Sequence, residues 1–212
     1  MSAPSGAGKG TLRRALLDRR RDIVFCPSVT TRKPRPGEIP GGDYLFVSED
    51  EFERKVRAGE LIEWARVYDH LYGTPGAALE SLLDGGYTVL VEKDVQGAKA
   101  LRSRYPDAVY VFVLPPSFEE LKKRVERRGT ESPGEVGVRL QSYAEELRQV
   151  GHYDYVIVND DLDTAERKLE AIITAERCRV SRNLGRLDVA AKEAEAAGVL
   201  STSGRVDEKG RF

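Results

Sequence analysis

The sequence predicts an α/β fold, a doubly wound parallel sheet with helices on both faces, and three observations support this prediction. Runs at 87–91, 108–114 and 155–158 are largely apolar at successive positions, as in strands that are buried on both faces. Helical patterns alternate with these runs along the 212 residues. A glycine-rich loop that ends in Gly8-Lys9 stands directly before the first helical pattern. Sheets of this kind bind ligands at the carboxyl ends of their strands.

The helices are indicated, in chain order, by apolar spacing and by signals at their ends. The first is expected over 11–21, directly after the glycine-rich loop. Each later helix is expected to begin where a capping side chain precedes an acid or a proline that suits the first turn. These starts are Ser48 with Glu51, Thr74 with Pro75, Ser117 with Glu120, and Asp163 with Glu166.

Two segments break the alternation and indicate the domain organisation. Residues 28–74 are richer in Gly, Pro, Tyr and Thr, and we interpret them as a small β-rich insertion at the carboxyl edge of the sheet. Residues 180–212 lose hydrophobic periodicity, so we expect a C-terminal tail that is partly disordered. The core of the protein is then expected over 1–27 and 75–179.

Composition limits the classes of partner. The chain has 34 basic and 35 acidic side chains and a net charge of -1, so bulk charge does not favour binding to nucleic acid or to a membrane. Cys26 and Cys178 lack the spacing of metal ligands and fit a reduced compartment. No apolar run approaches the length of a membrane span, and no signal peptide is visible. We therefore expect a cytoplasmic protein without nucleic-acid or membrane partners.

The opening stretch, MSAPSGAGKGTL, fits a phosphate-binding loop. It matches the pattern G-x-x-x-x-G-K except that Ala3 replaces the first glycine. Backbone N–H groups of such a loop converge on phosphates, which side chains at Gly6 and Gly8 would obstruct. Lys9 adds a cation, and the following helix adds its positive N-terminal end. The alternative is an incidental glycine-rich turn, which a lysine in register with a helix start makes improbable.

The expected nucleotide contacts are therefore Ser5, Gly6, Ala7, Gly8, Lys9, Gly10 and Thr11. Gly10 stands where many such loops carry a Ser or Thr that binds Mg²⁺. We expect no direct protein ligand to be essential, so that Mg²⁺ would be held by phosphates and water, with Thr11 or Asp94 as candidate additions.

A second cluster of anion-binding side chains lies in the insertion. The stretch SVTTRKPRPGE at 28–38 brings Arg32 and Arg35 close to Tyr44, and two guanidinium groups beside a tyrosine suit a phosphate. Alone, these arginines could equally be solvated surface residues. They are followed in order by DYLFVS, GELIEWA, LYGTP, DVQG, RRGTES and YDYVIVNDDLD. In order and spacing these motifs resemble guanylate kinase, a family of P-loop NTPase-like enzymes, from the opening loop to about Arg179.

The resemblance implies a Mg²⁺-dependent reaction in which ATP and GMP give ADP and GDP. It implies that the GMP phosphate is held by Arg32, Arg35, Tyr44 and Tyr72, and that guanine faces Ser28, Glu63, Thr74 and Asp94. A carboxylate at Glu63 could accept two parallel hydrogen bonds from the ring N–H and amino group of guanine, whereas adenine presents a lone pair there. Sites that pair a polar edge in this way reject analogues by roughly 10⁴-fold in good cases. We expect Phe52 and Trp64 to be core residues rather than stacking platforms.

The resemblance also implies a helical lid over about 124–142. Arg124, Arg128 and Arg139 would close on the ATP phosphates, and Asn159 would lie near adenine. Phosphoryl transfer depends on positioning and on cation clamps, so Lys9, Arg128 and Arg139 are the expected catalytic residues. As an alternative, an arginine-rich helix is often a solvated face, which we expect for Arg127.

Two departures from the family pattern stand out. Family members carry an apolar strand before the phosphate loop, where this chain has only Met1 and Ser2. Loss of about five buried residues at roughly 1.5–3 kcal/mol each would rival a stability of about 5–15 kcal/mol. We hypothesise that such a strand lies upstream of Met1, and that folding and ATP affinity suffer without it. The second departure is Lys93, where the family usually has an apolar residue; we expect it to reach solvent or an acid such as Glu92 or Asp94.

Two other functions remain open. Guanylate-kinase-like domains also serve as phosphopeptide-binding modules, but these typically lose the phosphate loop and the serine before TTR, whereas Lys9 and Ser28 are present here. A P-loop kinase for another small phosphate ester is the third interpretation. The expected partners are the small molecules GMP and ATP, and the protein is expected to be a monomer or a homodimer.

Overall fold

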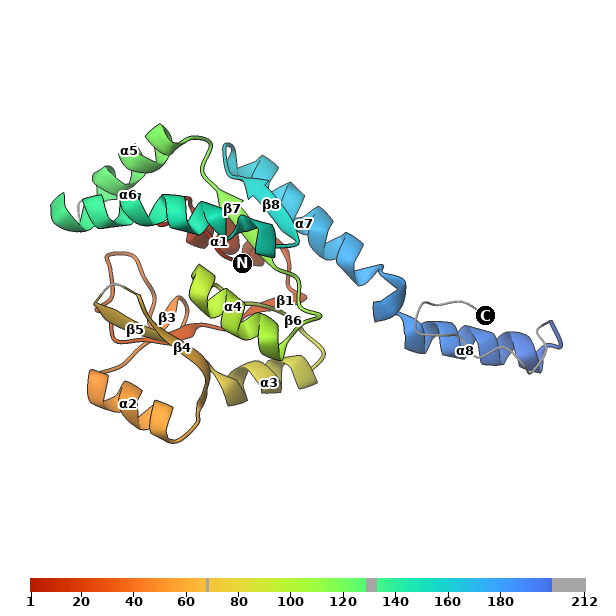
Figure 1. Ribbon diagram of the computed structural model, residues 1–212. Coiled ribbons are helices and arrows are strands. Elements are labelled where there is room, and N and C mark those ends of the chain that lie inside the picture. Colours follow the sequence, from red (N-terminus) through yellow and green to blue (C-terminus); the bar gives the residue numbers. More distant parts are fainter. Residues whose placement is uncertain (68, 129–132, 200–212) are drawn as a thin grey trace. The chain divides into compact units, whose positions relative to one another are not determined.

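The computed structural model of the protein describes residues 1–67, 69–128 and 133–199, with the side chains at 128, 133–136 and 138–140 left out (Figure 1). The chain separates into two compact units, Met1–Glu166 and Arg167–Phe212. The helices are α1 Lys9–Arg19, α2 Glu49–Arg57, α3 Gly76–Asp84, α4 Val95–Arg104, α5 Phe118–Arg128, α6 Pro133–Arg148, α7 Leu162–Arg177 and α8 Leu184–Ala196. Short 3₁₀ turns lie at Val150–His152 and Val180–Arg182.

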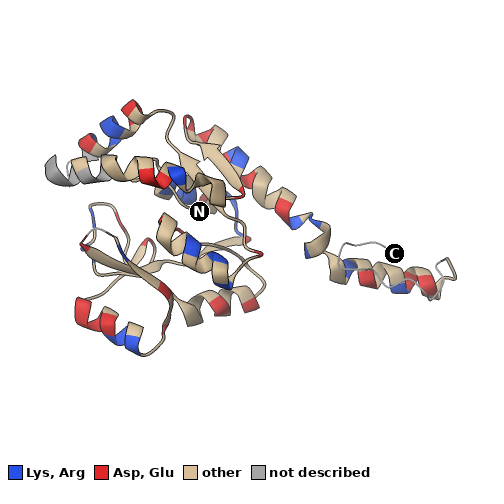
Figure 2. Cartoon of the chain, in the orientation of Figure 1, with Lys and Arg blue, Asp and Glu red and all other residues tan. Residues whose placement is uncertain are grey.

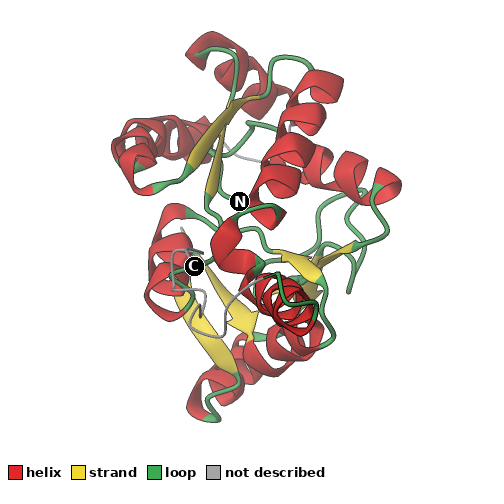
Figure 3. Ribbon diagram, turned by 90° about the vertical axis from the view of Figure 1, so that its right-hand side faces the viewer, coloured by secondary structure: helices red, strands yellow, loops and turns green. Residues whose placement is uncertain are grey.

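The core strands of the first unit are parallel, as predicted. Strand β1 (Ile23–Phe25) pairs with β6 (Thr88–Leu90), and β7 (Val111–Leu114) pairs with β8 (Tyr155–Val158). Each of the three apolar runs contains one of the strands β6, β7 and β8. Figure 3, turned by 90°, shows helices flanking these strands. The alternation of strands and helices is therefore the one that the sequence predicts.

The chain start lies between the two strand pairs. The Ser2 N–H donates to the Val111 carbonyl (2.9 Å), the Val113 N–H donates to the Ser2 carbonyl (2.8 Å), and the Lys93 N–H donates to the Met1 carbonyl (3.0 Å). Met1 and Ser2 are both buried, at 7% and 1% exposure. Met1 and Ser2 thus occupy the position between the strand pairs for which the sequence showed no apolar strand. The phosphate loop follows them directly.

The predicted insertion is a separate mixed sheet in the order β3-β2-β5-β4. Its strands are β2 (Ser28–Thr30), β3 (Tyr44–Phe46), β4 (Leu61–Val67) and β5 (His70–Pro75). Strand β2 runs parallel to β3 and antiparallel to β5, and β4 is antiparallel to β5. Val29, Phe52 and Leu71 form its apolar core. Trp64 is 51% exposed, so the expectation of a core tryptophan was wrong; the strand buries its neighbour Glu63 instead.

Two of the four predicted capping residues act as caps. The Ser48 hydroxyl accepts a hydrogen bond from the Glu51 N–H at the start of α2 (3.2 Å), and Ser117 does the same for Glu120 at α5 (3.1 Å). Figure 2 shows the acidic start and basic end of α2, which complement the helix dipole.

The other two caps were misplaced. Helix α3 begins at Gly76 with Pro75 at its cap position, because the Thr74 hydroxyl donates to Glu63. Helix α7 begins at Leu162, and Asp161 rather than Asp163 accepts from the Thr164 N–H (2.9 Å).

The C-terminal unit contains most of α7 and all of α8, in which Ala191 is buried. Partial disorder was predicted for the tail 180–212. Residues 200–212 of this tail lie outside the described part of the chain, so for them the expectation stays a prediction. None of the helices in the described ranges is long and apolar enough to cross a membrane.

Candidate active site

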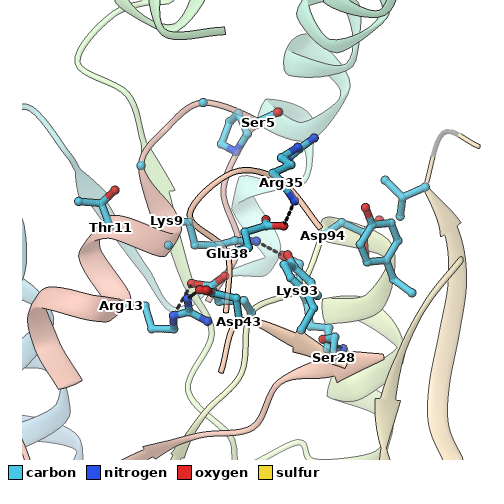
Figure 4. Close-up of a pocket in the computed structure, with 18 of the residues that line it drawn as sticks. Ser5, Lys9, Thr11, Arg13, Ser28, Arg35, Glu38, Asp43, Lys93 and Asp94 are labelled. Atoms are coloured by element: carbon cyan, nitrogen blue, oxygen red, sulfur yellow. Dashed lines mark hydrogen bonds and ion pairs between the residues drawn. The ribbon is translucent and has the colours of Figure 1, made fainter. Parts of the chain in front are cut away.

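A cavity of about 500 Å³ opens where the phosphate loop, the carboxyl end of β6 and the insertion meet (Figure 4). This is the carboxyl edge at which the sequence placed ligand binding. Twelve predicted site residues line it: Ser5, Gly6, Gly8, Lys9, Gly10, Thr11, Ser28, Arg35, Tyr44, Glu63, Tyr72 and Asp94. The structure thus brings together residues separated by up to about ninety positions in the chain.

The phosphate loop depends on two glycines with left-handed backbones. Gly6 has φ 97° and Gly8 has φ 87°, values that L side chains rarely adopt. A Cβ at Gly8 would also lie 2.4 Å from the Asn159 Nδ2. Asn159 in turn donates to the carbonyl of Ala7 (2.7 Å), so the residue that we expected near adenine holds the loop itself. Ala7, a predicted nucleotide contact, is fully buried, does not line the cavity, and donates its N–H to the Pro4 carbonyl (3.0 Å).

The positive end of α1 faces the same cavity. The helix begins at Lys9, has no acidic residue in its first turn, and lacks a side-chain cap among the described residues. Its first N–H groups are therefore available to an anion. The Lys9 ammonium donates to the Lys93 carbonyl (3.2 Å), and both residues line the cavity (Figure 4). At Gly10 a Cβ would meet no described atom within 4 Å, so there is room for a side chain that the sequence does not supply.

The predicted phosphate clamp of the insertion is centred on a residue that the sequence analysis missed, Glu38. Its carboxylate accepts from the Arg32 guanidinium at 2.8 and 3.0 Å and from the Arg35 N–H at 2.7 Å. Burial alone would raise the pKa of this carboxyl, but the hydrogen bonds from Arg32 and from the Arg35 backbone together lower it. Arg32 is 7% exposed and does not line the cavity, whereas Arg35 does.

Aromatic rings complete this cluster. The Arg32 guanidinium lies 5.2 Å from the centre of the Tyr44 ring, and the Tyr44 and Tyr72 rings meet edge to face at 6.0 Å. Burial raises the pKa of the Tyr44 hydroxyl, so it stays a neutral hydrogen-bond donor. The four residues predicted for the GMP phosphate therefore lie together, with Arg32 paired to Glu38 behind the cavity wall.

The residues predicted for guanine gather around Lys93. The Lys93 ammonium lies 2.9 Å from the Glu63 Oε1 and donates to the Ser28 hydroxyl (2.8 Å). The Thr74 hydroxyl donates to the same Glu63 oxygen. All four side chains are buried, with Lys93 at 7% exposure. Lys93 does reach an acid, as expected, but the acid is Glu63 rather than Glu92 or Asp94.

Asp94 has a structural task as well as a place in the cavity wall. Its carboxylate accepts from the Gly97 N–H (2.9 Å) and caps α4. A second pair that the sequence analysis missed lies nearby: Arg13 of α1 is buried, forms an ion pair with Asp43, and lies 3.7 Å from the Glu92 Oε1. This pair joins the helix after the phosphate loop to the insertion.

A second depression lies on the other side of the phosphate loop. Gly6, Gly8 and Thr11 line both hollows. The second also contains Arg124, held by Glu120 through its Nε (2.8 Å), together with Asn159. Its wall further includes Arg127, Asp160 and Leu162, so Arg127 is exposed, as expected, but lines a hollow. The side chains of Arg128 and Arg139 lie outside the described residues, and their expected roles stay predictions.

One titratable group near the end of α6 faces the cavity. Glu146 of α6 lines it, and its Oε2 is buried without a hydrogen-bond partner within the described part of the chain. Burial raises the pKa of Glu146 to about 7, with Lys9 lowering it and Asp94 raising it further. The sequence of α6 does not single out Glu146 as a site residue. It differs from the other acids of the helix in lying near Lys9 and Asp94, which only the folded structure shows.

The cavity contains oxygen donors that suit Mg²⁺. The described residues form no group of three or more His, Cys, Asp or Glu that could hold a metal ion by themselves. The Thr11 hydroxyl and the Asp94 carboxylate line the cavity, and the Glu92 Oε1 is buried there with no hydrogen-bond partner among the described residues. Hard oxygen donors of this kind, added to phosphates and water, match the preference of Mg²⁺.

Comparisons with known proteins agree with this architecture. A family model described as Guanylate kinase matches residues 1–176. Over 183 residues the chain is 49% identical to the guanylate kinase of Caldanaerobacter subterraneus subsp. tengcongensis (86% of this chain, 89% of that protein) and 51% identical to that of Symbiobacterium thermophilum (86% and 87%).

A solved structure extends the likeness to the fold. The crystal structure of guanylate kinase from Anaplasma phagocytophilum is similar with a TM-score of 0.75 and 34% identity, covering 94% of each chain. This likeness confirms the predicted fold class, a P-loop NTPase-like α/β fold with parallel strands. The chain belongs to the guanylate kinase family.

Proposed function

We propose that this chain transfers the γ-phosphoryl group of ATP to GMP with the help of Mg²⁺, giving ADP and GDP. The observation that carries the proposal is the presence of two hollows that share the residues Gly6, Gly8 and Thr11 of the phosphate loop. A nucleotide on one side can therefore present its terminal phosphate, at the loop, to an acceptor on the other side. Family membership supports the same reaction.

The donor nucleotide is assigned to the phosphate loop and the second depression. Its β- and γ-phosphates would take the backbone N–H groups from Gly8 to Thr11, and the Lys9 ammonium would leave the Lys93 carbonyl for a phosphate oxygen. Arg124 lies in the same depression and offers a further cation. Asn159 acts through Ala7 by holding the loop carbonyl, which fixes the direction of the loop N–H groups.

The acceptor is assigned to the larger cavity. Arg35, Tyr44 and Tyr72 line it and would bind the GMP phosphate, while Glu38 keeps Arg32 oriented behind them. Glu63 and Ser28, which line the same cavity, would take the base. This division puts the acceptor phosphate between the arginines and the phosphate loop, which is the orientation that an in-line transfer needs.

The chemical step needs positioning and charge more than proton transfer. The GMP phosphate is an anionic nucleophile, so no general base is required, and Lys9 is placed to stabilise the charge on the transferring group. When bound, Mg²⁺ neutralises phosphate charge and orients the phosphates, with Thr11, Glu92 and Asp94 as the nearest oxygen donors. The predicted clamp by Arg128 and Arg139 would complete the charge balance.

Partners and location are proposals of the same kind. The free cysteines Cys26 and Cys178 are compatible with a reduced, cytoplasmic location. We propose ATP and GMP as the small-molecule partners and a monomer or homodimer as the working form.

The test is ADP formation from Mg-ATP with GMP, AMP, CMP or UMP as acceptor. We expect turnover with GMP and a strong preference over AMP. Glu63→Gln should lower kcat/KM for GMP by at least about tenfold, because an amide cannot accept both guanine donors. Glu49→Gln, an exposed glutamate on α2, is the matched control and should leave turnover unchanged. GMP binding without turnover would instead indicate a binding module, and turnover with a different phosphate ester alone would refute the assignment of the acceptor.

A further inference from the structure

Lys93 has contacts that its place in the sequence does not explain. It follows β6, its N–H donates to Met1, and its carbonyl accepts from Lys9. Its side chain turns away from solvent and puts the ammonium between the Glu63 carboxylate and the Ser28 hydroxyl. The proposed base site therefore contains a buried cation next to its buried anion, and Lys93, Glu63 and Ser28 all line the cavity.

The lone pairs of Glu63 show why this matters. Its Oε1 already accepts from the Thr74 hydroxyl and lies 2.9 Å from the Lys93 ammonium, so both lone pairs are in use. Its Oε2 accepts no hydrogen bond from the described residues. Guanine presents two parallel donors, the ring N1–H and the 2-amino group, and these need one acceptor on each carboxylate oxygen. The base can pair in full with Glu63 only if one of these two donors gives up its place on Oε1, and the Lys93 ammonium is the one for which guanine itself offers a new acceptor.

A displaced ammonium needs a new acceptor. Lys93 is 7% exposed, burial already lowers its pKa, and a buried ammonium without a partner costs several kcal/mol. Guanine carries such an acceptor directly beside N1–H, namely the carbonyl oxygen at C6. Adenine carries an amino group there, which cannot accept from an ammonium. When a 6-oxopurine binds, the displaced ammonium therefore gains a new acceptor. When a 6-aminopurine binds, it gains none.

We propose that Lys93 is a base-recognition residue whose ammonium moves from Glu63 to the C6 oxygen of a 6-oxopurine when the acceptor nucleotide binds. The inference rests on the proposed function, since it assumes that GMP occupies the larger cavity. The Ser28 hydroxyl, which already accepts from Lys93 at 2.8 Å, keeps the ammonium at this wall during the exchange. Base selection then depends on three side chains, with Glu63 reading the donors of the base and Lys93 its acceptor.

The test compares two nucleotides that differ at one atom. GMP and 6-thio-GMP share N1–H and the 2-amino group, but sulfur at C6 is a weak acceptor. Their dissociation constants are measured by calorimetry, without ATP, for the full chain and for Lys93→Met, which keeps the length of the side chain and removes the charge. Because both ligands pair with Glu63, any effect of Lys93→Met on that carboxylate cancels in the ratio of the two constants.

We expect the unaltered chain to bind GMP about tenfold or more tightly than 6-thio-GMP, since hydrogen bonds to charged groups are among the stronger ones. In Lys93→Met this ratio should fall by about the same factor. Lys99→Met, an exposed lysine on α4, is the control and should keep the ratio of the unaltered chain. An equal ratio in the chain with and without Lys93 would overturn the proposal, and so would a variant that binds both ligands more tightly by one common factor, because Lys93 would then only compete for Glu63.

A second measurement covers the case in which Lys93→Met does not fold. The C6 carbonyl stretch of isotope-labelled GMP bound to the unaltered chain should lie at lower wavenumber than that of free GMP in water, because an ammonium donor is stronger than water. A stretch at or above the free value would overturn the proposal. Failure of the chain to bind GMP at all would overturn the proposed function together with this inference, whereas GMP binding without an effect of Lys93 would overturn the inference alone.

Discussion

The ionisation of Glu146 should make the folded protein less stable as pH rises. A salt-bridged acid has the opposite effect, because its ionised form stabilises the folded state. Burial raises the pKa of this carboxyl to about 7 in the folded chain, from an ordinary value of 4.5. Below about pH 4.5 the group is protonated in both the folded and unfolded states and has no effect. As pH rises from about 4.5 to about 7, the unfolded chain releases this proton and the folded chain retains it, so folding stability is lost.

The magnitude follows from the shift. A rise in pKa from 4.5 to about 7 corresponds to at most about 3 kcal/mol, since one pKa unit is worth about 1.4 kcal/mol. Glu146 keeps partial access to the cavity, so we expect about 1–2 kcal/mol. Glu146→Gln should therefore be more stable than the unaltered chain by this amount at pH 8 and equal to it at pH 4.5.

The assay is denaturant unfolding of both chains at pH 4.5, 6 and 8. Glu145→Gln is the control, because Glu145 is the neighbouring glutamate on α6 and lies exposed beside Arg148. A difference between Glu146→Gln and the unaltered chain that is the same at pH 4.5 and pH 8 would refute the reasoning. Nucleotide phosphates would bring further negative charge to Lys9 and Glu146, so calorimetry in buffers of different ionisation enthalpy should show proton uptake on GMP binding near pH 7.

Three further predictions concern stability and the phosphate loop. Gly8→Ala forces a side chain into a left-handed backbone and against Asn159; we expect a loss of about 2–4 kcal/mol in unfolding experiments and weaker ATP binding by calorimetry. Arg13→Met leaves buried Asp43 with the more exposed Arg14 (3.3 Å) as its remaining cation among the described residues and should lower stability by about 1.5–3 kcal/mol, and a smaller loss in the double change with Asp43→Asn would show that the weakened charge pairing is the cause. Ser48→Ala removes the cap of α2 and should cost about 1 kcal/mol while GMP turnover stays unchanged, which thermal unfolding and the kinase assay would check.

The fold could be predicted from local sequence because its determinants are local. Apolar runs mark β6, β7 and β8, and the hydroxyls of Ser48 and Ser117 cap the helices that directly follow them. The same logic was wrong for Thr74, whose hydroxyl is used by Glu63 on the neighbouring strand, eleven residues away. A hydroxyl that could cap a helix can instead bind a residue that is close only in the folded chain, and local sequence does not show which residues those are.

The site could be predicted in its outline but not in its internal pairing. The phosphate loop and the arginines of the insertion were found because glycine spacing and charge clusters are visible in a sequence. Glu38 and Glu146 were missed because an acid is informative only when it lies near a particular cation or cavity. The pairing of Arg32 with Glu38 also shows that a residue assigned to a ligand can be held by the protein before any ligand arrives.

Lys93 shows how such hidden pairing connects the two nucleotide sites. Its carbonyl holds the Lys9 ammonium of the phosphate loop, and its own ammonium holds Glu63 of the base site. ATP would draw Lys9 away from that carbonyl, and GMP would draw the ammonium away from Glu63, so both substrates act on contacts of a single residue at the carboxyl end of β6. If one exchange loosens Lys93 enough to ease the other, ATP and GMP should each bind more tightly in the presence of the other, and by thermodynamic linkage the two factors must be equal. Lys93→Met would remove the side-chain contact and leave the backbone contact, so any coupling that passes through the ammonium should disappear while the binding of ATP alone is retained.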